Sequence, residues 1–122
     1  MTHKDQATPA GAAVTTLAPA QFEETITAAS VPVLVDFMAD WCGPCRTQAP
    51  LLESFARNHQ GSVQVHKVDV DQASAIASRL GVRSIPTLML FAGGAPVASR
   101  VGVQSASALE ALLAEAQSAS ES

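Results

Sequence analysis

Apolar residues recur along the chain in two periods, which separate predicted helices from predicted strands. Val33–Met38 forms an almost unbroken apolar run, typical of a strand that is buried on both faces of a sheet. Phe22, Ile26 and Ala29 recur at helical spacing after Pro19, a residue that suits the start of a helix. The same reasoning predicts further helices over 43–59, 73–80 and around 109–113, and further strands over 62–70, 87–91 and 97–101.

The order of these segments predicts an α/β protein. Strands that alternate with helices in the first half should lie parallel, whereas Gly93-Gly94 between the last two strands predicts a hairpin and an antiparallel strand. We therefore expect a mixed sheet with helices packed on both faces. Pro50 falls within the predicted helix at 43–59 and should kink it.

Length and composition favour one folded domain. The chain has 122 residues, 48% of them hydrophobic, so it can bury one core without structural disulfides or metals. Residues 1–13 contain no run of large apolar side chains and are expected to form a disordered tail. Residues 119–122 are expected to fray, which leaves 14–118 as the domain.

Charge and hydropathy exclude several classes of partner. The net charge is −4 and no stretch is dense in Lys or Arg, so we expect no electrostatic binding to nucleic acid or to an anionic membrane. No apolar run approaches the ~18–20 residues of a membrane span, and the N-terminus shows no signal-peptide pattern. The expectation is a cytoplasmic protein, in which a static disulfide is rare.

The two cysteines lie in the motif Trp41-Cys42-Gly43-Pro44-Cys45, between the first buried strand and the predicted helix at 43–59. Near a helix N-terminus, unpaired N–H groups and the helix dipole favour a thiolate, so the pKa of Cys42 should fall. A thiolate attacks disulfides, and Cys45, one turn further along, can then attack Cys42 and release the product. Pro44 suits this first turn because its missing N–H would have no partner there.

Two other interpretations of the cysteines are a metal site and a buried, inert pair. Zinc takes four ligands, but there is no third cysteine, and His3, His59 and His66 lack ligand-like spacing and are expected at the surface. A metal site would therefore need a dimer that shares two cysteine pairs. A buried, inert pair is disfavoured by the Gly-Pro insert and by the adjacent Trp41.

Two charged residues fall in apolar settings. Asp36 interrupts the buried run, so burial should raise its pKa and allow proton exchange with Cys45, directly or through water. The alternative is an acid that is satisfied by hydrogen bonds alone. Lys67 shares a strand face with Val63 and Val65, and could pair with Asp36 if the two strands are neighbours. The alternative for Lys67 is an amine that reaches out to solvent.

The segment from Asp36 to Cys45 resembles the active-site segment of thioredoxins. The likeness covers about residues 14–118 and continues in register through Pro50, Lys67, Asp69-Val70-Asp71, 81–87, Gly93-Gly94 and Gly102. It implies the thioredoxin fold, a central mixed β-sheet with helices on both faces in the order β-α-β-α-β-α-β-β-α. Met38 departs from the pattern, since many bacterial relatives have a second tryptophan there.

The resemblance implies a role for each candidate site residue. Cys42 is the nucleophile, Cys45 the resolving thiol, and Asp36 the buried acid–base with Lys67 beside it.

The resemblance also implies a substrate-binding surface. Pro86 should be cis and face the cysteines, which exposes the Ile85 backbone to an extended substrate segment. Trp41, Ile85 and Gly102 would form an apolar surface of low profile around it. From the residues alone, Gly102 could equally be a plain turn or bulge glycine.

A general protein-disulfide reductase is the function that the resemblance implies, with a part in electron transport and cell redox homeostasis. Thioredoxin reductase would recharge the Cys42–Cys45 redox-active centre with electrons from NADPH, and the chain itself would bind no cofactor and no metal. Clients could include peroxiredoxins, ribonucleotide reductase and methionine sulfoxide reductases, and a monomer is expected. An oxidase or isomerase usually has His between the cysteines, where this chain has Gly43-Pro44. A non-enzymatic binding subunit or holdase is the third possibility.

Overall fold

Nine helices and strands follow one another in residues 13–121, the part of the chain described by the computed structural model. They are β1 (Thr15–Thr16), α1 (Pro19–Ala28), β2 (Val33–Met38), α2 (Gly43–Asn58), β3 (Gln64–Asp69), α3 (Ser74–Arg79), β4 (Thr87–Ala92), β5 (Ala95–Val101) and α4 (Ala106–Glu121). This order confirms the one that the family resemblance implied. Residues 1–12 of the predicted tail, and Ser122 of the predicted frayed end, lie outside the described residues.

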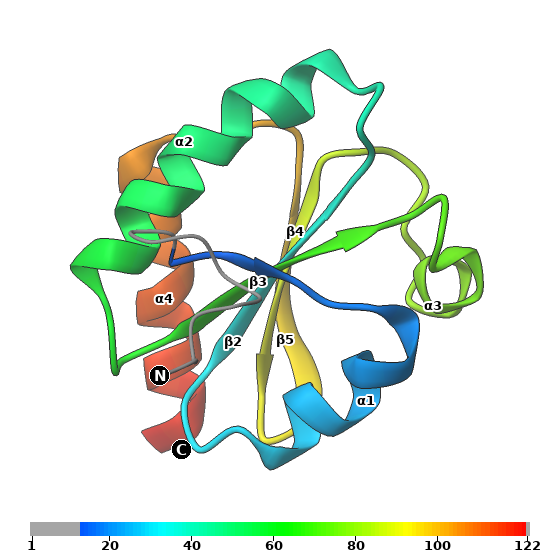
Figure 1. The fold of residues 1–122 in the computed structure, drawn as a ribbon. Helices are drawn as coiled ribbons and strands as arrows, with labels where there is room; N and C mark the ends of the chain where they lie inside the picture. The colour runs from blue at the N-terminus through cyan, green and yellow to red at the C-terminus, as the bar shows by residue number, and fades with distance from the viewer. Residues whose placement is uncertain (1–12, 122) are drawn as a thin grey trace, which may run out of the picture.

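The strands form one mixed sheet in the order β1-β3-β2-β4-β5 (Figure 1). β1, β3 and β2 are parallel, whereas β4 is antiparallel to both β2 and β5. The predicted mixed sheet is therefore confirmed. β2 is the central strand and has a neighbour on each side. Helices pack on both faces of the sheet around it, which explains its almost unbroken apolar sequence.

Helices cover both faces of the sheet, as predicted, with α2 and α4 on one face and α1 and α3 on the other (Figure 1). Successive residues of β2 point to opposite faces because a strand has a period of two. Val33, Val35 and Phe37 pack in the core beneath α1 and α3. Leu34 packs in the core beneath α2 and α4, and the same alternation directs Asp36 to that side.

The β4–β5 hairpin turns at Gly93-Gly94, as predicted. Both glycines have positive φ, 62° and 82°, which is the conformation of a type I′ turn. The register shifts by one residue between Leu90 and Phe91, so β5 contains a bulge. Pro96 in β5 lies opposite Phe91 in β4, and β5 is one of the two edge strands of the sheet.

His66 is half-buried rather than freely exposed, because β1 pairs with β3 beside it. Its Nδ1 lies 2.7 Å from the Thr15 hydroxyl, and its Nε2 lies 3.1 Å from the side-chain oxygen of Gln64. Burial lowers the pKa of His66 below its usual value. The imidazole therefore belongs to the packing of the sheet edge.

Candidate active site

Cys42 and Cys45 lie where the chain leaves the central strand and enters α2. Cys42 is the N-cap residue, with an extended backbone (φ −87°, ψ 113°), and Cys45 falls in the first turn of the helix. Their Cα atoms are 5.3 Å apart and a disulfide joins them. Each residue is only 4% exposed. The spacing in sequence therefore produces a pair that can form and break one bond.

The start of α2 provides a donor for the sulfur of Cys42. The Cys45 N–H donates to Cys42 Sγ at 3.2 Å, and Pro44 in the same turn has no N–H of its own. Unpaired N–H groups and the helix dipole favour negative charge at this end of a helix. The sulfur of Cys42 therefore lies where a helix favours negative charge.

Asp36 is buried on the α2 side of the sheet without a protein partner. The residue is 1% exposed, and within residues 13–121 neither carboxyl oxygen makes a hydrogen bond. Burial raises the pKa of this carboxyl from 3.8 to about 7, and the positive charge of Lys67 offsets part of the rise. Among the described residues, the alternative that protein hydrogen bonds satisfy Asp36 is therefore not supported.

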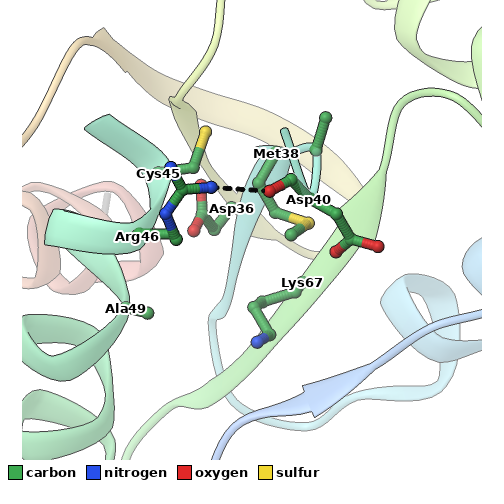
Figure 2. A pocket seen from close by; sticks show the side chains of 8 residues that line it. Asp36, Met38, Asp40, Cys45, Arg46, Ala49 and Lys67 are labelled. Atoms are coloured by element: carbon green, nitrogen blue, oxygen red, sulfur yellow. Dashed lines mark hydrogen bonds between the residues drawn. The ribbon is translucent and has the colours of Figure 1, made fainter. Parts of the chain in front are cut away.

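A pocket of about 200 Å³ connects Asp36 with Cys45 (Figure 2). This volume can hold water, and its wall carries the polar groups that bound water requires. Lys67 lines the same pocket and lies directly opposite Asp36 across the β2–β3 pair, which confirms that the two strands are neighbours. Asp36 and Cys45 therefore border one cavity that is large enough for water.

The loop before β4 faces the cysteines from the other side. The Ile85–Pro86 peptide bond is cis, as the resemblance implied, and the Ile85 carbonyl oxygen lies 4.0 Å from Cys42 Sγ. Gly102 has a φ of 92° and donates its N–H to the Pro86 carbonyl at 2.8 Å. A Cβ at Gly102 would meet no atom within 4 Å, so the glycine borders open space.

Trp41 is 68% exposed, and its partner comes from a distant part of the chain. Its indole N–H donates to Asp71 Oδ2 at 2.8 Å. Thirty positions separate the two residues, and only the pairing of β2 with β3 brings their loops together. No spacing in the sequence signals this contact.

Arg46 also belongs to this site, although the sequence alone does not signal it. Its guanidinium donates to the Asp40 carbonyl at 2.8 Å and lines the pocket of Asp36 and Cys45 (Figure 2). The side chain thus joins the first turn of α2 to the loop that precedes Cys42.

Replacing Asp71 with alanine should free the Trp41 indole, because its hydrogen bond to a carboxylate is lost. We expect lower fluorescence anisotropy of Trp41, the single tryptophan, with a stability loss of about 1 kcal/mol or less. Asp40→Ala is the matched control, since it removes an equal charge next to Trp41 and keeps the Asp40 carbonyl. Equal anisotropy in the two variants would contradict the anchoring role of Asp71.

Comparisons with known proteins agree with this geometry. The family model described as Thioredoxin matches residues 13–115. Thioredoxin from Alicyclobacillus acidocaldarius is 50% identical over 103 residues, which cover 84% of this chain and 97% of that protein. Thioredoxin from Pseudomonas aeruginosa is 47% identical over 94 residues, 77% of this chain and 87% of that protein. The fold is also similar to the solved structure of an N21Q mutant thioredoxin from Halobacterium salinarum, with a TM-score of 0.74 and 39% sequence identity. The match covers 84% of this chain and 88% of that chain.

These likenesses, together with the Cys42–Cys45 disulfide, show an enzyme of the thiol–disulfide oxidoreductase class. Its chemistry is dithiol–disulfide exchange at a redox-active pair. The chain belongs to the thioredoxin family.

Residues 13–121 contain neither a metal-binding cluster nor a membrane span. Within residues 13–121, no group of three or more His, Cys, Asp or Glu residues could hold a metal ion. No helix in this part of the chain is both long and apolar enough to cross a membrane.

Proposed function

We propose that the protein is a general protein-disulfide reductase in which Cys42 attacks and Cys45 resolves. The observation that carries this proposal is the disulfide at the start of α2, with a helix N–H on the Cys42 sulfur. The Cys42 thiolate attacks one sulfur of a client disulfide, which forms a mixed disulfide and releases one client thiolate. Cys45 then attacks Cys42 Sγ, which releases the second client thiolate. Two electrons pass to the client, and the chain is left in the disulfide form described above.

Asp36 is proposed as the acid–base for the second step. Cys45 must lose its proton to attack, and Asp36 can accept it through water in the shared pocket. A carboxyl with a pKa near 7 exchanges protons readily at neutral pH. Lys67, directly opposite on β3, keeps that pKa from rising further.

The proposed docking surface consists of Trp41, Ile85, Pro86 and Gly102. Ile85 offers backbone groups beside Cys42, to which an extended client segment can pair as an added strand. Trp41 contributes exposed apolar area on one side of this segment. Gly102, on the other side, has no side chain to obstruct it.

The proposal extends to partners and location. Thioredoxin reductase, with NADPH as the electron source, would return the Cys42–Cys45 disulfide to the dithiol. Peroxiredoxins, ribonucleotide reductase and methionine sulfoxide reductases are candidate clients. The chain would act as a cytoplasmic monomer, with residues 14–118 as the working domain.

Insulin reduction is the direct test. With NADPH and an active thioredoxin reductase, we expect the oxidised chain to be reduced and then to reduce insulin, measured as NADPH consumption and insulin precipitation. No turnover with that reductase would overturn the proposal.

A redox titration separates a reductase from an oxidase. A reductase should have a potential below about −220 mV, within or under the range of cytosolic glutathione. A potential near that of strong oxidants, about −120 mV, would indicate an oxidase instead. Client binding that survives in the Cys42→Ser, Cys45→Ser double variant, without any turnover of the wild type, would indicate a holdase.

A further inference from the structure

Gln48 is a fully buried polar residue in the helix that carries the cysteines. It lies three residues after Cys45 in α2 and its exposed fraction is 0%. Leu52 and Phe55 follow at four and seven residues, and both belong to the apolar core beneath α2 and α4. Gln48 therefore occupies a helix position where an aliphatic side chain would ordinarily pack.

The amide of Gln48 bonds in both directions to the backbone of one residue in another loop. Its Oε1 accepts the Gln104 N–H at 2.6 Å, and its Nε2 donates to the Gln104 carbonyl at 3.1 Å. Gln104 lies between β5 and α4, 56 residues further along the chain. Both backbone groups of this loop residue are thus satisfied by one side chain of the active-site helix.

From Gln104 the hydrogen bonds continue to the loop before β4. The Gln104 side-chain amide donates to the Gly102 carbonyl at 3.0 Å, and the Gly102 N–H donates to the Pro86 carbonyl at 2.8 Å. Polar contacts therefore run without interruption from α2 to Gly102 and Pro86. These two residues belong to the proposed docking surface.

We infer that Gln48 is a positioning residue, which fixes the Gly102 and Pro86 side of the docking surface relative to the cysteine pair. Burial of an amide is unfavourable unless its hydrogen bonds form, so only one placement of the 102–104 loop satisfies Gln48 and Gln104 together. An apolar residue at position 48 would fill the core but leave the loop free to shift. This inference rests on the docking surface under Proposed function.

Gln48→Met is the first test, because methionine has a similar length and no amide. With dithiothreitol as the recycling reductant, we expect the KM for insulin to rise about fivefold or more, because the N–H and the carbonyl of the partly buried Gln104 lose their partners. The kcat should stay within about twofold, since bound insulin restores the loop placement. Reduction of a small aromatic disulfide, which needs no docking surface, should keep its wild-type rate. Gln117→Met, at an exposed position on α4, is the matched control and should change neither constant.

Gln48→Glu is the second test, and it stays informative if the methionine variant does not fold. A protonated carboxyl group has one acceptor and one donor, like the amide, whereas an ionised carboxylate can only accept. The ratio of its insulin KM to that of the wild type should therefore be near one at low pH and rise as the pH increases. Dividing by the wild type at each pH removes the pH dependence that the two proteins share.

The outcomes separate this inference from the proposed function. An unchanged KM in Gln48→Met, or equal losses with insulin and with the small disulfide, would overturn the positioning role. A KM ratio for Gln48→Glu that does not vary with pH would overturn it as well. Failure of the wild type to reduce insulin would instead contradict the proposed function.

Discussion

Cys42→Ser is expected to abolish disulfide reduction, with a loss of about a thousandfold or more, because a serine hydroxyl does not replace a thiolate in thiol–disulfide exchange. The fold should persist, since Cys42 is a small buried residue at a helix N-cap, a position that serine fills well. The insulin assay measures the loss, and circular dichroism checks the fold. Substantial turnover by this variant would show that Cys42 is not the nucleophile.

Cys45→Ser should fail at the opposite step and accumulate a covalent intermediate. Cys42 still attacks the client, but no second thiol one turn along the helix can displace it, so the mixed disulfide persists. We expect mass spectrometry to find an adduct of one client chain per protein, which dithiothreitol removes. Cys42→Ser is the matched control and should form far less adduct. The reverse pattern of trapping would exchange the roles of the two cysteines.

Asp36→Asn is expected to stabilise the oxidised protein at alkaline pH. The folded wild type keeps the Asp36 proton up to about pH 7, whereas an unfolded chain loses it near pH 3.8. Because the folded state binds more protons between these values, the wild-type free energy of unfolding falls as pH rises through this window and levels off above it. The pKa difference corresponds to a loss of at most roughly 4 kcal/mol in the free energy of unfolding of the wild type. Asparagine does not titrate, so the variant does not undergo this loss.

Urea unfolding from pH 4 to pH 9 measures this effect. The free energy of unfolding of the variant should increase relative to that of the wild type as pH rises to about 7, and the difference should then stay constant. Asp40→Asn, at an exposed position in the same segment, should follow the wild type. Parallel pH curves for Asp36→Asn and the wild type would mean that Asp36 titrates normally in the folded state.

The same Asp36→Asn variant should reduce insulin at a rate about tenfold lower, or lower still, because asparagine cannot take the proton of Cys45. The slowed step is the attack of Cys45 that releases the client, so the mixed disulfide should accumulate during turnover. Rates equal to those of the wild type across pH 6–9 would contradict a role for Asp36 in proton transfer.

Much of the fold could be predicted from the sequence because each main element has its own period. The apolar run of β2 and the helical spacing of α1, α2 and α4 are local patterns, and the structure confirms them. β1 has only two residues, too few for any period, and the residues alone did not reveal it. The half-buried setting of His66 went unpredicted for the same reason, since it depends on β1.

The candidate site divides in a similar way. Cys42, Cys45 and Asp36 lie within one short stretch, so spacing and burial could be inferred together. The partners of Trp41 and Gln48 come from segments 30 and 56 residues away, and their contacts exist only after the sheet has formed. Gln48 did carry one signal, since it lies four residues before Leu52 on the apolar face of α2.

The hairpin geometry of β5 has a consequence for solubility. An edge strand offers unpaired backbone groups that can recruit a strand from another molecule and begin aggregation. In β5 the bulge alters the twist, and Pro96 removes one donor from the row. This edge of the sheet is therefore a poor template for a strand from another molecule, whereas the Ile85 backbone is the place proposed for client pairing. The extra residue of the bulge and the missing N–H of Pro96 both discourage self-association through β5.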